Sequence, residues 1–184
     1  MPDMQTQDAH RAPFLRAARL LFAFLLSAAL TGLNAEAVKA PAEEFSQALA
    51  DLKQQTALPI LLPAHLPPMH KGPVYASGTG NAGSYAIRIE SDPDCDHANA
   101  CFLGIFRAKR DGRLSLPDAV TIGKDTQGRY QETSCGASCS APSIQWKSKD
   151  VVYTVQLNLS TADEKQARKW MIDLASESIL AGPR

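Results

Sequence analysis

The residues with the clearest potential for chemistry form an acidic run near the middle of the chain. Asp92, Asp94 and Asp96 stand at alternate positions, and His97 follows directly. Alternating carboxylates open the calcium loop of an EF-hand, and histidine is a common zinc ligand. The EF-hand pattern fails here, because His97 stands at the sixth position, where glycine is needed, and Leu103 at the twelfth, where glutamate is needed. The run therefore predicts either a weak calcium or zinc contact of another kind or an acidic hairpin tip closed by a disulfide.

The chain contains four cysteines, which in an exported protein predict two disulfides. Cys95 and Cys101 are close in sequence, as are Cys135 and Cys139, and both pairs stand in polar, loop-like stretches. Of the three pairings that four cysteines allow, we predict these two local bridges, which would fix the shape of their loops. The spacing of Cys135 and Cys139 differs from the CxxC motif of thioredoxin-like proteins, so a redox role is not predicted.

A group of cationic side chains surrounds a predicted turn. Arg107, Lys109, Arg110 and Arg113 flank the dipeptide Asp111-Gly112, which is typical of turns between strands. One interpretation is a solvated hairpin tip. The other is a contact with an anion or an acidic partner.

Motifs for nucleotide binding and for nucleophilic catalysis are incomplete. Residues 78–83 match GxGxxG, but this fingerprint needs a helix after it, because the helix N-terminus binds the pyrophosphate. Residues 84–90 instead alternate between apolar and polar side chains, as a strand does. The glycines therefore predict a hairpin loop. Ser138 lies outside a GxSxG motif, and the sequence predicts no catalytic residue and no cofactor.

The clearest structural element is residues 143–180, which predict a hairpin followed by the helix that covers it. Apolar side chains alternate through residues 144–146 and 151–159. Thr161 and Glu164 have the spacing of a capping box at a helix start, and Gly182 lies just beyond the predicted end. An apolar stripe at helical spacing includes Trp170, which is predicted to anchor the core.

The elements before this module complete the predicted fold. Residues 42–56 have helical periodicity, and the prolines of residues 58–68 favour an extended segment along the core. Strands are predicted at residues 74–77, 84–90, 100–108, 119–123 and 129–133. We predict an α+β fold, in which an antiparallel sheet of about six or seven strands is flanked by an N-terminal and a C-terminal helix.

The N-terminal residues 1–37 are predicted to be a signal peptide. Three arginines precede an apolar run of about 14 residues, which is shorter than a membrane span, and Ala35-Glu36-Ala37 matches a cleavage site. Residues 38–184 are then a single α+β domain, periplasmic or secreted, without a transmembrane segment after cleavage. The chain has 19 basic and 19 acidic residues, and this neutral balance does not favour a nucleic-acid partner.

Several segments together resemble a known group of proteins. They are Asp-Cys-Asp-His-Ala-Asn-Ala-Cys at 94–101, Ser-Ile-Gln-Trp at 143–146, Val-Val-Tyr-Thr-Val-Gln at 151–156 and Leu-Ala-Ser-Glu-Ser-Ile at 174–179. Over most of residues 38–184 the chain is similar to small exported bacterial proteins of unknown function, which are frequent in cyanobacteria. Its final hairpin and helix resemble uncharacterised envelope domains of Gram-positive bacteria, and the resemblance implies a PsbP-like architecture. No catalytic residue is implied.

These observations favour a non-enzymatic extracytoplasmic accessory or binding domain, whose partner is an envelope protein or a cell-wall component. One alternative is a hydrolase-like envelope enzyme whose residues converge only in the folded chain. A second alternative is weak metal binding by residues 92–97. A pocket with two titratable side chains in contact would favour the enzyme, whereas an open sheet face or an exposed apolar patch would favour the binding domain.

Overall fold

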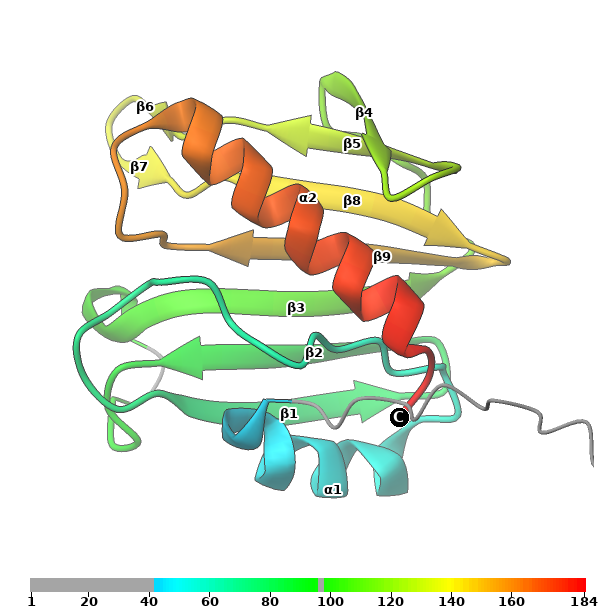
Figure 1. The fold of residues 1–184 in the computed structure, drawn as a ribbon. Helices are drawn as coiled ribbons and strands as arrows, with labels where there is room; N and C mark the ends of the chain where they lie inside the picture. Colours follow the sequence, from blue (N-terminus) through cyan, green and yellow to red (C-terminus); the bar gives the residue numbers. More distant parts are fainter. Residues whose placement is uncertain (1–41, 96–97) are drawn as a thin grey trace, which may run out of the picture. The chain divides into compact units, whose positions relative to one another are not determined.

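A seven-stranded antiparallel sheet forms the centre of the computed structural model, which describes residues 42–95 and 98–184. The strand order is β1-β2-β3-β9-β8-β5-β4 (Figure 1). The strands are β1 (Tyr75–Asn81), β2 (Ser84–Glu90), β3 (Phe102–Arg110), β4 (Asp118–Ile122), β5 (Thr126–Gln131), β8 (Ser143–Ser148) and β9 (Val151–Leu157). A separate two-stranded ribbon consists of β6 (Ser134–Cys135) and β7 (Cys139–Ser140). The predicted signal peptide lies outside the described residues.

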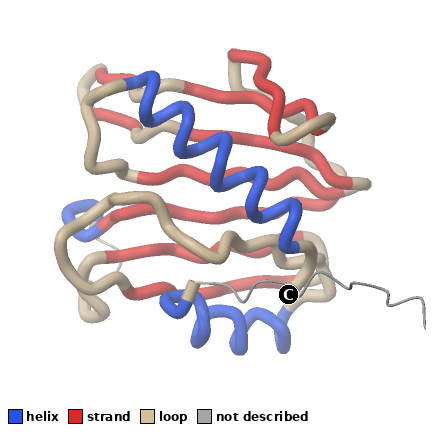
Figure 2. The backbone as a smooth tube through the Cα atoms, viewed as in Figure 1, coloured by secondary structure: helices blue, strands red, loops and turns tan. Residues whose placement is uncertain are grey.

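Two helices lie against the same face of this sheet (Figure 2). A short 3-10 turn, η1 (Glu43–Phe45), leads into α1 (Ser46–Gln55), which packs beside β1, and α2 (Glu164–Ala181) crosses the strands diagonally. A second 3-10 turn, η2 (Asn99–Cys101), precedes β3. The predicted α+β class is therefore confirmed. Within the part of the chain that the structure describes, no helix has the length and apolar character that a membrane crossing requires.

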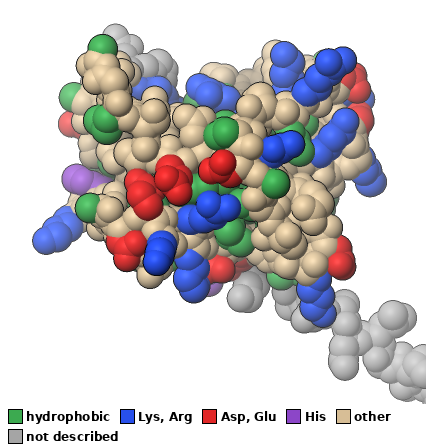
Figure 3. Space-filling view, turned by 90° about the horizontal axis from the view of Figure 1, so that it is seen from above, with side chains coloured by type: hydrophobic (Ala, Val, Ile, Leu, Met, Phe, Trp, Pro, Cys, Tyr) green, Lys and Arg blue, Asp and Glu red, His purple; other side chains and the backbone are tan. Residues whose placement is uncertain are grey.

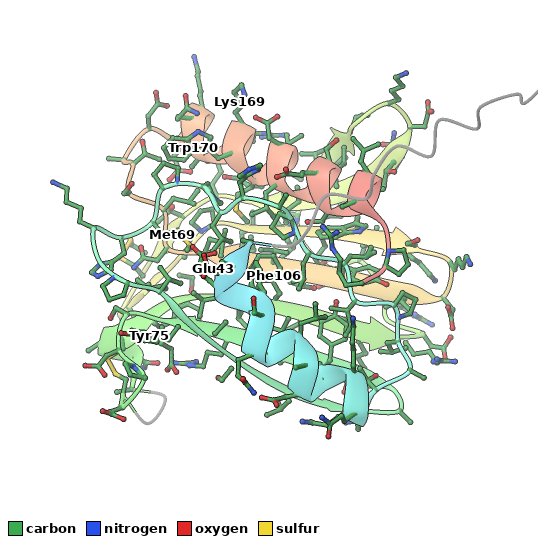
Figure 4. The ribbon with its side chains drawn as sticks, turned by 60° about the horizontal axis from the view of Figure 1, so that its bottom comes forward. Glu43, Met69, Tyr75, Phe106, Lys169 and Trp170 are labelled. Carbon is green, nitrogen blue, oxygen red and sulfur yellow. A yellow bond between two sulfur atoms is a disulfide. The ribbon has the colours of Figure 1, made fainter. Side chains whose placement is uncertain are left out.

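The core fills the space between the sheet and the helices. Phe45 and Phe106 meet edge to face with their ring centroids 5.2 Å apart, and Figure 4 shows Phe106 close to the start of the first helix. Trp146 and Tyr153 stack at 5.4 Å. The predicted extended segment at residues 58–68 is confirmed, because it contributes buried apolar side chains without forming a helix. These side chains are Leu58, Ile60, Leu61 and Leu62.

The predicted hairpin between β1 and β2 is confirmed, but its loop is shorter than the predicted residues 78–83, because β1 continues through the first two glycines. Only Ala82 and Gly83 form the turn to β2. Helix α1 explains the glycines. A Cβ atom on Gly78 would lie 2.8 Å from the carbonyl oxygen of Ala48, and one on Gly80 would lie 3.1 Å from a methyl carbon of Leu52. These residues therefore lack side chains so that the helix can approach the strand closely.

The predicted hairpin tip at Asp111-Gly112 is wrong, because β3 does not pair with β4. The chain passes over three strands before β4 begins at the far edge of the sheet. We name this connection, residues 111–117, the strap. The backbone N–H groups of Ser115 and Leu116 both donate to Oε1 of Gln145, at 2.9 and 3.2 Å. The strap therefore lies across the sheet face opposite the helices.

Two expectations about α2 need correction. Its N-cap is Asp163 rather than Thr161, because the Asp163 carboxylate accepts hydrogen bonds from the backbone N–H groups of Lys165 and Gln166. Its end at Gly182, which has a φ of 71°, is as predicted. Trp170 is only partly buried and does not belong to the hydrophobic core, so it is not the predicted anchor.

Candidate functional site

One face of the seven-stranded sheet carries no helix, and we name it the open face. Along β2, the side chains of Tyr85, Ile87 and Ile89 are buried beneath the helices. The alternate residues of the strand point the opposite way. Strand pairing extends this division to every strand, because directly paired residues lie on the same face. The pairing register therefore decides which strand residues belong to the open face.

The strap covers the part of the open face that β9, β8 and β5 form. A Cβ on Gly112 would lie 3.0 Å from Cβ of Val152, and Gln145 binds the strap backbone. As a result Val152 is 5% exposed and Gln145 8% exposed, although both belong to the open face. Arg129 donates to the carbonyl oxygen of Pro117 at 2.9 Å. The strap thus covers the middle of this half, while Arg129 and Lys147 of the same half stay exposed.

The other half is formed by β1, β2 and β3. It is uncovered at the end nearest the β1–β2 turn, whereas Ile105 and Glu90 further along the same face are buried. Two of the paired rows across the three strands lie at the uncovered end: Thr79, Ala86 and Arg107 in one row, and Asn81, Ser84 and Lys109 in the next. The β2 residues are small and partly buried, whereas the β1 and β3 residues on either side are exposed. These rows place small residues of β2 between longer, exposed residues, which are hydroxyl and amide residues on β1 and cations on β3. We name this three-stranded strip the trough, with β2 as its floor and β1 and β3 as its walls.

The cationic wall has two side chains without a partner in the described structure. Arg107 and Lys109 are exposed, and the described residues offer them no hydrogen bond or ion pair. They are two residues apart on one strand, so their Cα atoms are about 7 Å apart. On the opposite wall, Ser77 and Thr79 are exposed hydroxyl residues with the same separation. The trough therefore offers regularly spaced donors along both walls.

An aromatic and ionic group closes one end of the trough. Arg88 donates from Nε to Oε1 of Glu90 at 2.8 Å, and its guanidinium lies 4.9 Å from the ring centroid of Phe102. Tyr75 pairs with Glu90 across the strands and is 40% exposed. Figure 4 shows Tyr75 at the beginning of β1. This end combines a fixed cation with exposed aromatic surface, a combination that is enriched at binding interfaces.

The charges of the strands divide between the two faces. Among the strand residues of the seven-stranded sheet, all of which the structure describes, Glu90 is the one carboxylate on the open face. The same face carries five cations: Arg88, Arg107, Lys109, Arg129 and Lys147. Asp118 is paired with Tyr130 and therefore lies on the helix side. The neutral total charge thus conceals a cationic open face.

Both cysteine pairs lie at the end of the sheet opposite the β8–β9 turn. The structure brings Cys95 to Cys101 and Cys135 to Cys139 at disulfide distance, with Cα separations of 6.2 and 4.0 Å, so the two predicted pairs are confirmed.

Figure 3 looks at the molecule from the β4 side, with the open face along the upper outline, which is hollowed between two projections. Lys and Arg side chains gather on the right-hand projection, at the strap end of the sheet (Figure 3).

The predicted cations do not form one cluster. Arg107 and Lys109 share the trough wall. Arg110 approaches Asp150 at the end of the sheet, with 3.7 Å between its Nη1 and the carboxylate oxygen, and Arg113 is exposed on the strap. Arg88 and the hydroxyl wall are not among the residues that the sequence predicts. Arg88 alternates with the apolar residues of β2, and this alternation places it on the solvent side of the strand. The hydroxyl residues of β1 could not be placed in the same way, because the sequence does not show how far β1 extends.

The predicted metal ligands are only partly described. Asp92 accepts a hydrogen bond from the backbone N–H of Asp94 at 2.9 Å, and both side chains are exposed. Asp96 and His97 lie outside the described residues. Among residues 42–95 and 98–184, no group of three or more His, Cys, Asp or Glu side chains is placed to hold a metal ion.

Pairs of titratable groups lie at α2. His65 Nδ1 and Glu177 Oε1 are 3.0 Å apart at the surface, whereas Tyr130 and Glu164 form a buried group. The hydroxyl of Tyr130 is fully buried and has no hydrogen-bond partner among the described residues. The same is true of Oε2 of Glu164. Burial, with a smaller contribution from the Glu164 charge, raises the pKa of Tyr130 to about 12. A shallow depression elsewhere is lined by Lys53, Arg110 and uncharged residues at the ends of α1 and β1. It contains no nucleophile beside a general base.

Comparison with known proteins adds no family to these observations. No protein-family model, no curated protein and no solved structure matches this chain.

Proposed function

We propose that this protein is a non-catalytic binding domain that holds a partner in the trough on the open face of its sheet. The observation that carries the proposal is the trough itself, with its small-residue floor between the exposed residues of β1 and β3. Five cations and one carboxylate face outward from this side of the sheet. Such a surface suits recognition, because regularly spaced donors fix the register of a bound chain.

The trough is supported by a rigid sheet. Its floor strand, β2, is paired along its whole length on both sides. On β9, the next strand of the open face, the Gln156 amide donates to the carbonyl oxygen of Ala141 at 3.2 Å. A surface held in this way loses little conformational entropy on binding, which favours affinity. The Arg88–Glu90 contact likewise holds the cation at the end of the trough.

The setting that we propose is the bacterial cell exterior, periplasmic or secreted. The two cysteine pairs support it, because disulfides persist in oxidising compartments. The predicted signal peptide and the resemblance to small exported proteins point to the same setting. The proposed partner is an envelope protein or a cell-wall component.

A hydrolase is not proposed, since the depression beside α1 and the buried group around Tyr130 supply no nucleophile and base in contact. Metal binding by Asp92, Asp94, Asp96 and His97 stays a prediction, because Asp96 and His97 lie outside the described residues. A binding role needs only the surface that the described residues form.

Site-specific photo-crosslinking tests the proposal. Ser77 lies on the trough wall and Gln54 on the exposed side of α1, and both are exposed. Each is replaced in turn by p-benzoylphenylalanine in cells that produce the protein from its own gene. We expect discrete adducts of higher mass from position 77 and none from position 54. Equal adducts from both positions, or none from either, would contradict a partner bound in the trough.

A further inference from the structure

Resting on the proposed binding role, we infer that the partner enters the trough as an extended polypeptide segment with acidic side chains at alternate positions. The trough runs along β2, between the exposed wall of β1 and the cationic wall of β3. It is bordered on the β9 side by the strap, which covers the neighbouring strands. A narrow occupant that lies along β2 fits this strip.

The spacing of the cations matches an extended chain. Arg88, Arg107 and Lys109 occupy three successive levels along the strand direction, because Arg88 pairs with Ile105, which precedes Arg107 by two residues. Successive levels are about 7 Å apart. In an extended polypeptide, side chains that point to the same side repeat at the same interval of about 7 Å. Carboxylates at alternate positions would therefore meet Arg107 and Lys109, while the Arg88 level, where the cation is already paired with Glu90, would meet the residue before them.

The two ends of the trough suit different side chains of the bound segment. At the Arg88 end, exposed Tyr75 and partly buried Phe102 offer apolar surface beside the cation. Towards the β1–β2 turn, Arg107 and Lys109 have no ionic partner in the described structure. An apolar residue followed by alternating acidic residues satisfies both ends.

The ring of Phe102 is a poor platform for stacked bases. The ring of Phe102 already has the Arg88 guanidinium 4.9 Å above its centroid, so that face of the ring is occupied. Single-stranded nucleic acids are typically bound on exposed aromatic platforms. The hydroxyls of Ser77 and Thr79 can instead donate to carboxylates, which accept several hydrogen bonds each.

Binding of purified protein to poly-L-glutamate tests this inference. We expect binding that weakens as salt rises, because exposed charges are screened within about 10 Å at 0.1 M salt. The double variant Arg107→Glu with Lys109→Glu is expected to lose at least about tenfold in affinity. A matched variant, Lys124→Glu with Lys165→Glu, makes the same change in net charge at exposed positions outside the trough. It is expected to stay within about twofold of the parent.

Four results would overturn the inference. They are absence of poly-L-glutamate binding, equal losses in the two double variants, tighter binding of oligo(dT) or of phosphatidylglycerol vesicles, and a crosslinked adduct of twice the chain's mass, which identifies a second copy. Circular dichroism of both double variants establishes that they fold. If position 77 still crosslinks in cells while poly-L-glutamate does not bind, the acidic-segment inference fails and the binding role stands. If neither occurs, both fail.

Discussion

The two sides of β2 and β3 show how one pair of strands serves two purposes. Towards the helices, Ile87 and Phe106 are paired and almost completely buried. The next residue of each strand points towards solvent: Ala86 and Arg107 are paired there and form part of the trough. Side chains on the first side are fixed by packing, whereas those on the second contribute little to the fold. The comparison teaches that stability and binding should respond to different residues only one position apart.

Truncating the buried side should have the largest effect. Phe106 is 2% exposed and contacts Phe45, so Phe106→Ala should lower the free energy of unfolding by about 3–5 kcal/mol. Arg107→Ala, at the next position but on the open face, should change it by less than about 0.5 kcal/mol. Urea unfolding of both variants measures the difference. Similar losses for the two would break the comparison.

High pH should destabilise the covered side through its buried tyrosines. Burial raises the pKa of Tyr130 and of Tyr153 to about 12, and it raises the pKa of Tyr85 as well. Their stabilisation is complete below pH 10 and declines above it, because the unfolded chain releases protons that the folded chain retains. Each tyrosine can contribute up to about 1.4 kcal/mol per pH unit to the decline in unfolding free energy.

Chemical denaturation between pH 9 and 12 measures this decline. Tyr130→Phe should reduce the slope by the share of one tyrosine, while stability near pH 7 changes little, because the Tyr130 hydroxyl has no hydrogen-bond partner among the described residues. An unchanged slope in this variant would show that Tyr130 does not titrate as its burial requires.

A smaller effect should separate two neighbours on β1. Gly78→Ala places a Cβ atom 2.8 Å from the carbonyl oxygen of Ala48, so it should cost about 1–3 kcal/mol of unfolding free energy as α1 is pushed from the strand. Thr79→Ala, on the trough side, should stay within about 0.5 kcal/mol. Thermal unfolding of the two variants gives the comparison. A neutral Gly78→Ala variant would mean that α1 does not approach β1 this closely.

The sequence predicted the elements of the covered side better than the arrangement of the open side. Alternation identified the β8–β9 hairpin, because Ile144, Trp146 and Tyr153 had to share one buried face. Alternation cannot show which glycines form turns. Gly78 and Gly80 were interpreted as a loop, whereas the close approach of α1 is what requires them. The hydroxyl wall of the trough was therefore missed.

Long-range pairing was the second feature beyond reach. The Asp111-Gly112 dipeptide favours a turn locally, yet β3 pairs with β9, some forty residues further along, and the strap results from that choice. The helix start was misplaced for a local reason. Thr161 and Asp163 are both good N-cap residues, and only the folded chain shows that the Asp163 carboxylate accepts the helix N–H groups. The separation of cations and carboxylates between the two faces of the sheet likewise becomes visible only once the strand register is known.

Lysine reactivity tests most directly whether the trough is a binding surface. Acetylation of the protein in its native envelope fraction is compared, by mass spectrometry, with acetylation of the purified protein. Lys109 lines the trough, whereas Lys124 and Lys165 are exposed outside it. We predict that Lys109 is protected in the envelope fraction and that Lys124 and Lys165 react equally in both samples. Full reactivity of Lys109 in the envelope fraction, or equal protection of all three lysines, would contradict the account.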